Sequence, residues 1–352
     1  MQKLTLPIGL FNIGIQCNLN CDGCYTLSNY QLNGYHRWGD FKDTYKQWSE
    51  KIDLTMWHVY GGEPTLNPTL LDWLAGLSEL WPNANGKITT NGSTLNDSTK
   101  SKQLYEFIAN STTPIEVHIS LHDISNLSAM TDKIKLWLSE IEFTGRTDLN
   151  TIYESQENWL RTYNSIRGDA WPDCLSWNEF DTLPEWIQNE CKEVFNFSKE
   201  LFQDKISGYK FVDKNGVTVV LNRIYWHSNG PLLPQSDNKT FKLYSSDPIK
   251  AHSVCDNREC MEFYEGKLHK CNTAGHFIEF DKQFYIDLTD AERQTMYDYR
   301  PGSSDWTIED IETFIRSSKD PISQCQFCPE KVERTEIHAS TKKVIFQKKI
   351  NF

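Results

Sequence analysis

The sequence lacks several features that would assign a protein to a class at once. No apolar run in its 352 residues is long enough to cross a bilayer, and Met1 leads directly into a β-rich run rather than into an export signal. Basic residues are outnumbered by acidic ones, 36 to 48, so the net charge of −12 disfavours a partner with a phosphate backbone. We therefore expect a cytoplasmic protein that binds neither membranes nor nucleic acids.

Cysteine, by contrast, is plentiful. Ten cysteines in a chain without an export signal indicate metal binding in a reducing compartment rather than a disulfide framework. Cys17, Cys21 and Cys24 follow the apolar run 8–15 at the spacing C-x3-C-x2-C. Three thiolates suit an iron–sulfur cubane and leave one of its irons without a protein ligand, whereas zinc usually takes four ligands. The triplet by itself leaves both the iron–sulfur and the zinc interpretation open.

Hydrophobic periodicity predicts strands that alternate with helices. The strands are rich in β-branched and aromatic residues, and the helices repeat their apolar residues every three or four positions. The predicted strands are 6–16, 54–60, 87–90, 115–121 and 217–225, and the predicted helices are 40–50, 67–80 and 97–109. This alternation predicts an α/β fold with a parallel sheet.

The predicted strand 115–121 differs from an ordinary buried parallel strand. Its residues alternate strictly between apolar and polar, with Glu116, His118 and Ser120 on one face. Strands of a parallel α/β barrel are usually apolar on both faces, so a polar face predicts an open lumen. An edge strand with one wetted side is the alternative.

Three further motifs follow the cysteine triplet along the chain. They are Gly61-Gly62-Glu63-Pro64 after the second strand, Thr90-Asn91-Gly92 after the third, and Ile119-Ser120-Leu121-His122 at the end of the fourth. With the triplet, they resemble the motifs of the radical SAM superfamily. The resemblance implies a partial (β/α)6 TIM-like barrel over residues 1–230, and a 4Fe-4S cluster on Cys17, Cys21 and Cys24 whose open iron binds S-adenosylmethionine. The cofactor-binding residues that it implies are Tyr25, Gly61, Gly62, Glu63, Asn91 and Ser120.

Two positions depart from that family's pattern. Gly23 stands where an aromatic residue is frequent, so stacking on the cofactor would fall to Tyr25 or to another residue. His122 stands where the family usually has an acidic residue. His118 and His122 are the candidates for catalytic residues, and the sequence identifies no catalytic acid or base.

The C-terminal part carries a second cysteine set. Cys255, Cys271, Cys325 and Cys328, with Gly266 between the first two, resemble the SPASM/Twitch extension of the same superfamily. The resemblance implies a small Twitch-like α+β domain over residues 231–335 with a second, auxiliary 4Fe-4S cluster. Cys260 is then surplus, and it either replaces Cys255 as a ligand or is a buried bystander. A four-thiolate zinc site is the alternative.

The remaining segments yield coarser predictions. Residues 143–207 interrupt the alternation and contain four tryptophans, which predicts a helical insertion with one long helix at 183–205. In the C-terminal part we expect a hairpin turning at Glu265-Gly266 and a helix at 307–317. Residues 336–352 form a separate tail that contains a terminal strand.

The resemblance also implies a reaction. A radical SAM enzyme cleaves S-adenosylmethionine reductively, and the 5′-deoxyadenosyl radical abstracts hydrogen from the substrate. We expect an oxidoreductase-like enzyme that dehydrogenates or epimerises a small molecule, with an external one-electron reductant such as flavodoxin or ferredoxin. Peptide or protein modification and a non-catalytic iron–sulfur or zinc protein are the alternatives. The identity of the substrate does not follow from the sequence.

Overall fold

The computed structural model divides the chain into two compact units. The first comprises Met1–Thr90 and Trp226–Phe352, and the second comprises Asn91–Tyr225. The residues that the structure describes are 3–21, 24, 26–30, 32–121, 127–138, 141–142, 208–223, 226–227, 232–234, 241–255, 261–284, 286–331 and 334–335. Within these ranges, no helix combines the length and the apolar character that crossing a membrane requires.

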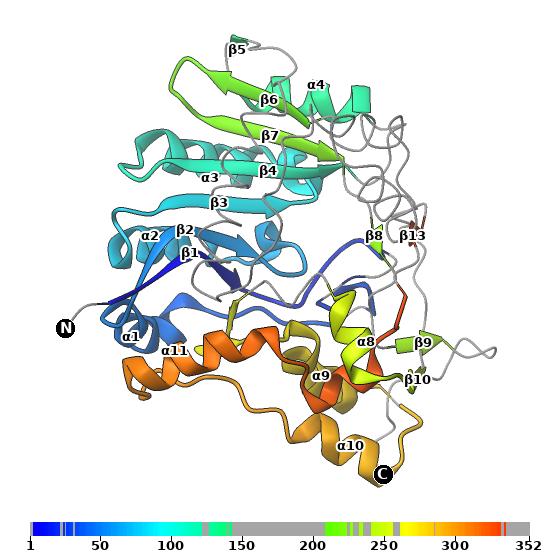
Figure 1. The fold of residues 1–352 in the computed structure, drawn as a ribbon. Coiled ribbons are helices and arrows are strands. Elements are labelled where there is room, and N and C mark those ends of the chain that lie inside the picture. The colour runs from blue at the N-terminus through cyan, green and yellow to red at the C-terminus, as the bar shows by residue number, and fades with distance from the viewer. Residues whose placement is uncertain are drawn as a thin grey trace, which may run out of the picture. The chain divides into compact units, whose positions relative to one another are not determined.

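Parallel strands form the centre of the first unit (Figure 1). The register of β1 and β2 runs from Leu4 opposite Ile52 to Asn12 opposite Tyr60. On the other side of β1, β11 is also parallel, and β12 returns antiparallel to β11. The strands are β1 (Leu4–Asn12), β2 (Ile52–Tyr60), β3 (Asn85–Thr90), β11 (Glu262–Tyr264) and β12 (Lys267–His269), in the order β12-β11-β1-β2-β3.

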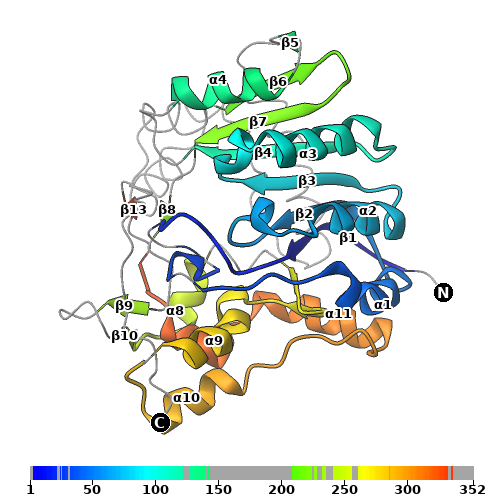
Figure 2. The same cartoon turned by 180° about the vertical axis from the view of Figure 1, so that it is seen from behind.

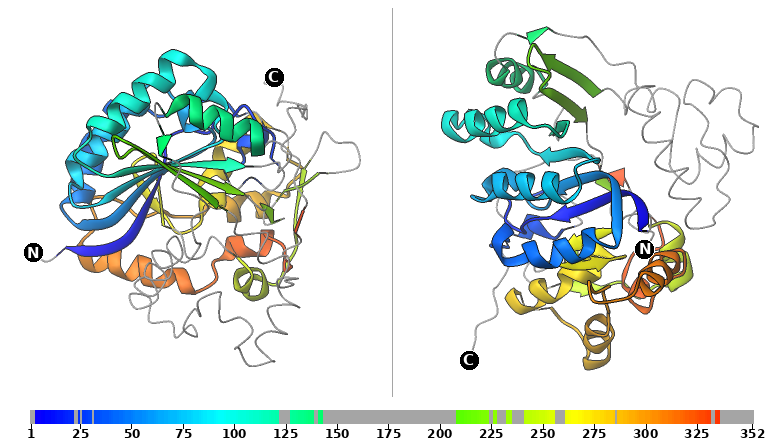
Figure 3. Two further views of the ribbon diagram at one scale, coloured as in Figure 1. Left: turned by 90° about the horizontal axis from the view of Figure 1, so that it is seen from above. Right: turned by 90° about the vertical axis from the view of Figure 1, so that its left-hand side faces the viewer.

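Two helices connect these strands and cover one face of them (Figure 3). They are α1 (Trp38–Ser49) and α2 (Leu70–Leu80), and both are amphipathic. Trp48 of α1, Trp73 of α2 and Trp57 of β2 are fully buried, and Phe11 stacks on Phe263 at 4.8 Å between ring centroids. Buried aromatic area of this size is a large stabilising contribution, so the sheet and its helices form one core.

The β11–β12 hairpin is joined to the same core. Its turn residues Glu265 and Gly266 have positive φ angles of 48° and 72°, as a two-residue hairpin turn requires. The Trp48 indole donates to the Gly266 carbonyl at 2.9 Å, and the Gly266 amide donates to the Tyr45 hydroxyl at 3.2 Å. The predicted hairpin is confirmed, and it extends the sheet edge that β1 would otherwise expose.

Short helices precede and follow the hairpin in the chain, with α9 packed beside α10 (Figure 2). Thr289 and Thr307 begin two of these helices with complete capping boxes. The helix predicted at 307–317 is confirmed as α11, whereas α8, α9 and α10 were not predicted. The helices are α8 (Pro248–Ser253), α9 (Asn272–Gln283), α10 (Asp290–Tyr297) and α11 (Ile308–Arg316), with 3-10 turns η7 (Ser317–Lys319) and η8 (Ser323–Phe327).

One apolar cluster connects these helices to the segment that carries the first three cysteines. Ile15, Leu27 and Leu32 flank those cysteines, and they are buried with Phe277 of α9 and Phe327 of η8. The remaining buried members of the cluster are Leu243, Tyr264, Phe280, Phe284, Ile286 and Met296. The cysteine loop therefore depends for its support on residues more than two hundred positions away.

The first unit also contains smaller elements. Two ribbons pair β9 (Leu232–Pro234) with β10 (Phe241–Leu243) and β8 (Trp226–His227) with β13 (Arg334–Thr335). The 3-10 turns are η1 (Ser28–Tyr30) and η2 (Pro64–Leu66).

The second unit is also α/β. β4 pairs in parallel with β7, β6 is antiparallel to β7, and β5 is antiparallel to β6. Strands predicted at 115–121 and 217–225 are confirmed, whereas β6 and α4 were not predicted. The elements are η3 (Ser93–Asn96), α3 (Ser98–Asn110), β4 (Ile115–Leu121), α4 (Leu127–Trp137), β5 (Ile141–Glu142), β6 (Gly208–Asp213) and β7 (Thr218–Arg223).

These elements confirm the predicted α/β class, with parallel strands connected by helices as in a partial TIM-like barrel. The predicted insertion at 143–207 with its helix, and the tail at 336–352, lie outside the described residues. The domain boundary near residue 230 stays a prediction. The two compact units divide the chain after Thr90 and after Tyr225. β11, from the C-terminal part of the chain, pairs directly with β1 within the first unit.

Candidate active site

The segment that follows β1 and the turn that follows β2 are bonded to each other through their backbones. The Gly62 amide donates to the Gly14 carbonyl at 2.8 Å, and the Glu63 amide donates to the Gln16 carbonyl at 2.8 Å. Gln16 directly precedes Cys17. Because β1 and β2 are adjacent and parallel, their carboxyl ends bring into direct contact two segments whose bonded residues are 47 and 48 positions apart in the sequence.

The two glycines of this turn are required by the close approach. A Cβ atom on Gly61 would lie 2.4 Å from the Gly14 carbonyl oxygen, and one on Gly62 would lie 2.2 Å from the Gln16 carbonyl oxygen. Gly61 also has a φ of 147°, which L-residues rarely adopt. Both groups in the way are backbone, so any side chain here must push the turn and the cysteine segment apart.

The carboxylate of Glu63 is fixed at this junction. The residue is 3% exposed, and its Oε1 accepts from the Thr65 amide at 3.1 Å and from the Thr65 hydroxyl at 2.5 Å. The hydroxyl of Thr90, at the end of β3, also donates to Oε1 at 2.6 Å. A carboxylate held by three donors is a pre-positioned acceptor for a positively charged group.

Cys17, the first cysteine of the triplet, lies within electrostatic reach of this carboxylate and of Cys24. Cys21 is buried, and Cys17 and Cys24 are half-buried. Burial, with smaller contributions from Cys24 and Glu63, raises the pKa of Cys17 to about 12, although the Leu19 amide opposes the shift by donating to Sγ at 3.4 Å. A thiol in such surroundings stays protonated unless a cation replaces its proton, as iron or zinc does when it binds.

A small pocket opens at the same place. It is formed by the end of β1, the segment before α1 and the turn after β2, and Glu63 is part of its wall. Its lining residues are Ile13, Gly14, Gln16, Gly34, Tyr35, Glu63, Pro64, Leu66 and Asn67.

The four C-terminal cysteines come from three short elements. Cys255 follows α8, Cys271 is the N-cap of α9, and Cys325 and Cys328 lie in and directly after η8. Burial, with smaller contributions from Cys255 and Cys325, raises the pKa of the Cys271 thiol to about 12. Cys328 has its pKa raised in the same way by burial and by the other three thiols. The four predicted ligands therefore share one neighbourhood.

Their chemistry fits a metal better than a disulfide. None of the seven described cysteines is disulfide-bonded. Within the described ranges, no group of three or more His, Cys, Asp or Glu side chains already has the geometry to hold a metal ion. Binding would therefore require the thiols to lose their protons and turn toward a common centre. Seven soft sulfur donors, in one set of three and one set of four, suit iron–sulfur clusters.

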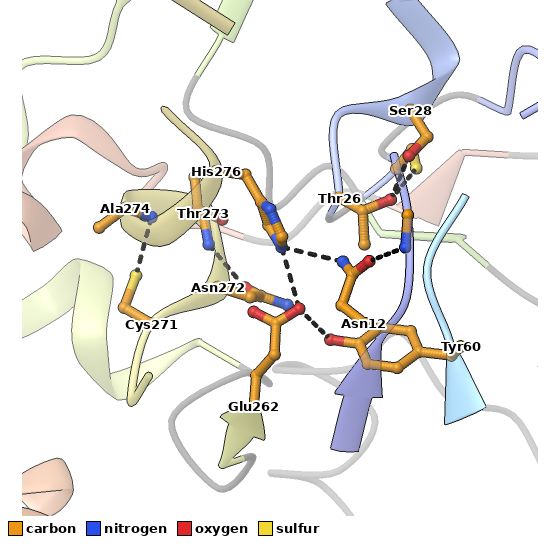
Figure 4. Close-up of polar contacts among 12 residues, drawn as sticks. Asn12, Thr26, Ser28, Tyr60, Glu262, Cys271, Asn272, Thr273, Ala274 and His276 are labelled. Atoms are coloured by element: carbon orange, nitrogen blue, oxygen red, sulfur yellow. Dashed lines mark hydrogen bonds and ion pairs between the residues drawn. The ribbon is translucent and has the colours of Figure 1, made fainter. Parts of the chain in front are cut away.

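A buried polar network, which the sequence did not predict, lies between the two cysteine sets in the first unit (Figure 4). His276 Nε2 lies 2.9 Å from Glu262 Oε1 and 3.1 Å from Asn12 Nδ2. The Tyr60 hydroxyl donates to the same Glu262 oxygen at 2.7 Å. Glu262 is 1% exposed, and burial raises its pKa. The histidines His276 and His269, with the Tyr60 bond, outweigh that effect and hold the pKa below its usual value.

This network could be recognised only from the tertiary structure. Asn12 ends β1, Tyr60 ends β2 and Glu262 starts β11, so their side chains converge only because the three strands are neighbours. His276 lies on α9, a helix that the sequence did not predict, so no local pattern pointed to this residue.

The remaining predicted residues belong to the second unit or lie outside the described ranges. Ser120 and His118 are 9% and 8% exposed, and His118 Nε2 lies 3.1 Å from Glu116 Oε2. Asn91 Oδ1 accepts from the Ser93 amide at 2.9 Å, and Gly92 has a φ of 71°. Tyr25, Cys260 and His122 lie outside the described residues, so their predicted roles stay predictions.

Comparison with known proteins gives partial overlaps with solved structures. No protein-family model matches the chain, and no curated protein does. The chain is similar to Streptococcus suis SuiB bound to S-adenosylmethionine, at 22% identity, covering 33% of this chain and 25% of SuiB, with a TM-score of 0.27. It is also similar to BtrN in complex with AdoMet and 2-DOIA, at 24% identity, covering 34% of this chain and 47% of BtrN, with a TM-score of 0.27.

A third similar structure is anSMEcpe with bound AdoMet, at 18% identity, covering 57% of this chain and 62% of anSMEcpe, with a TM-score of 0.29. The three are radical SAM enzymes. The chain spans between a quarter and a half of the length of the first two. At TM-scores this low, the overlap by itself assigns no reaction, so the function has to be inferred from the residues of the site.

Proposed function

We propose that this chain is a radical SAM enzyme. The observation that supports this function best is the junction of the two motifs. The Gly61–Glu63 turn is bonded to the backbone that leads into Cys17, and the Glu63 carboxylate lies within electrostatic reach of the Cys17 sulfur. A structural zinc site needs no fixed carboxylate and no glycine turn beside its thiols, whereas a cofactor with an ammonium group needs both.

Each residue then has a defined task. Cys17, Cys21 and Cys24 hold a 4Fe-4S cluster once their thiol protons have left, and Glu63 accepts from the ammonium group of S-adenosylmethionine. The backbone at Gly61 and Gly62 can approach the ligand closely because it carries no side chain. When bound, the cluster and S-adenosylmethionine supply a 5′-deoxyadenosyl radical that takes hydrogen from a substrate. Of the other predicted cofactor contacts, Tyr25, Asn91 and Ser120 remain part of the proposal.

The second cysteine set extends this function. We assign Cys255, Cys271, Cys325 and Cys328 to an auxiliary 4Fe-4S cluster in a Twitch-like C-terminal region. With four protein ligands such a cluster has no open iron, which suits electron transfer rather than substrate binding. An auxiliary electron acceptor fits a redox reaction of a small molecule, such as a dehydrogenation, with a flavodoxin or ferredoxin as the external reductant.

One experiment tests the central proposal. The protein is reconstituted anaerobically with iron and sulfide, and is then incubated with S-adenosylmethionine and dithionite while 5′-deoxyadenosine is measured by liquid chromatography and mass spectrometry. We expect product from the wild type and none from Cys24→Ala. Cys191→Ala, a cysteine with no predicted ligand role, is the matched control and should keep its activity. Product formation by the Cys24→Ala protein, or zinc in place of iron, would overturn the proposal.

A binding measurement tests the role of Glu63. Glu63→Gln keeps the shape of the side chain but removes its charge, so S-adenosylmethionine should bind the reconstituted protein about 10- to 100-fold more weakly. Thr90→Val is the control, because it removes one hydrogen bond to the carboxylate and leaves the charge in place. Equal affinities of the wild type and Glu63→Gln would contradict the assignment.

Iron analysis tests the auxiliary site. In a chain with Cys17, Cys21 and Cys24 all changed to alanine, we expect about four irons per chain to remain, as one cubane requires. Zinc in that protein would contradict the auxiliary cluster. Mass spectrometry of candidate small molecules and of co-expressed peptides separates small-molecule chemistry from peptide modification.

A further inference from the structure

Two charged side chains of opposite sign lie close to the four C-terminal thiols. Lys270 directly precedes Cys271 at the end of the β11–β12 hairpin. Its ammonium nitrogen donates to the Ser317 hydroxyl at 2.8 Å and lies 5.2 Å from the centre of the Phe314 ring. These two contacts hold the half-buried ammonium group on the side of the molecule where the chain continues from α11 to Cys325.

The ammonium group of Lys270 is within electrostatic reach of the thiols. It interacts with the sulfur groups of Cys271 and Cys325, and also with the carboxylate of Asp320. Asp320 is exposed, so water screens its charge more than it screens the half-buried groups. The ammonium group of Lys270 is therefore screened less than the Asp320 carboxylate, and it contributes a positive potential at the two thiols.

Glu262 provides the opposite charge. It is buried, with Tyr60 donating to its carboxylate and His276 within hydrogen-bonding distance. It lies beside the first turn of α9, which Cys271 caps (Figure 4). The carboxylate is among the groups that act on the Cys271 sulfur. Its own hydrogen bonds favour the ionised form, so a fixed negative charge lies close to the same site.

A cluster held by four thiolates becomes more negative when it accepts an electron. A nearby positive charge stabilises that reduced form and a nearby negative charge destabilises it, and both effects are stronger where little water is present. We propose that Lys270 and Glu262 set the electron affinity of the auxiliary site in opposite directions, Lys270 raising its reduction potential and Glu262 lowering it. This inference rests on the proposed function, because it requires a redox-active cluster on these thiols.

The test uses the full chain with Cys17, Cys21 and Cys24 changed to alanine, so that only the second cluster gives a signal. Its midpoint potential is measured by redox titration followed by electron paramagnetic resonance. Lys270→Met should make reduction of the cluster about tenfold less favourable, which is about 59 mV downward for one electron. Glu262→Gln should shift the potential upward by a comparable amount, and Lys270→Arg should restore the parent value.

Two matched controls separate these effects from general ones. Lys267→Met removes an exposed lysine three residues earlier, in β12, whose ammonium group also bonds to a serine. Glu279→Gln removes a carboxylate that pairs with Lys282 on the far part of α9. Both controls should leave the potential unchanged. Shifts of the same sign in Lys270→Met and Glu262→Gln, or shifts no larger than the controls, would overturn the inference.

The outcomes also distinguish a failure of this inference from a failure of the proposed function on which it rests. A parent protein without an iron signal, or with zinc, refutes the auxiliary cluster before any charge is changed. If Glu262→Gln loses iron because the buried network fails to form, Lys270→Met and Lys270→Arg alone test the inference. Lys270→Met at the parent potential then refutes the inference, and a downward shift that Lys270→Arg reverses supports it.

Discussion

The contact between the Gly61–Glu63 turn and the cysteine segment can be tested by adding a single methyl group. Gly62→Ala would place a Cβ atom 2.2 Å from the Gln16 carbonyl oxygen and 2.6 Å from the carbonyl carbon. Neither atom belongs to a flexible side chain, so the two backbones must separate. That separation breaks the hydrogen bonds from the Gly62 amide to Gly14 and from the Glu63 amide to Gln16, both 2.8 Å long.

The expected cost follows from these contacts. Losing two backbone hydrogen bonds costs about 1 kcal/mol each, and forcing an extra carbon into packed surroundings costs about 1–3 kcal/mol. We therefore expect Gly62→Ala to lower the free energy of unfolding by about 3–5 kcal/mol. Urea denaturation of the metal-free protein measures this change. S-adenosylmethionine binding by the reconstituted protein should weaken as well, because Glu63 moves with the turn.

Two other glycines make the comparison specific. Gly39 lies in α1, and an added Cβ would have no atom within 4 Å, so Gly39→Ala should stabilise the protein by up to about 1 kcal/mol through helix propensity. Gly216 also has free space but a φ of 79°, so Gly216→Ala should cost about 1–2 kcal/mol through backbone strain alone. If Gly62→Ala unfolds within about 0.5 kcal/mol of the wild type and binds S-adenosylmethionine normally, the proposed contact is refuted.

Two further predictions concern packing and pH. Phe277→Ala should cost about 3–5 kcal/mol and reduce the iron content of both cysteine sets, because Phe277 belongs to the cluster that supports both; Ile249→Ala, at a position 68% exposed, should change neither quantity. Burial lowers the pKa of His36 to about 4, with His276 adding to the effect, so His36 contributes stability that is complete above about pH 6.5 and is lost as the pH falls toward 4. His36→Phe keeps the aromatic contacts and should reduce the slope of the unfolding free energy against pH by at most about 1.4 kcal/mol per pH unit. An unchanged slope would contradict the buried, neutral state of this histidine. His269, whose pKa burial also lowers to about 4, should maintain the remaining slope.

Local sequence patterns predicted most of the first half of the fold. The strands of the predicted sheet have apolar alternation, and the strands 54–60 and 87–90 are followed directly by glycine-containing turns, so their existence and order followed from local patterns. The boundaries shifted by a few residues, as with β1, which spans Leu4–Asn12 instead of 6–16. The short helices α8 and α10 were missed, because at lengths of 6 and 8 residues they carry little periodic signal and depend on tertiary packing. The 12-residue α9 was missed because its buried face includes polar residues such as His276 and Asp281, which interrupt the apolar pattern.

The sequence by itself determined which chemical groups are present and how they are spaced: a triplet of cysteines, a glycine-glycine-glutamate turn and four further cysteines. These were readable because ligand spacing and turn chemistry are local properties of the chain. Only the tertiary structure decided that β11 adds to the edge of β1, which brings Glu262 and His276 to Asn12 and Tyr60. The physical reason is that strand pairing and core packing join residues hundreds of positions apart, and no local pattern records which edge a returning strand will choose.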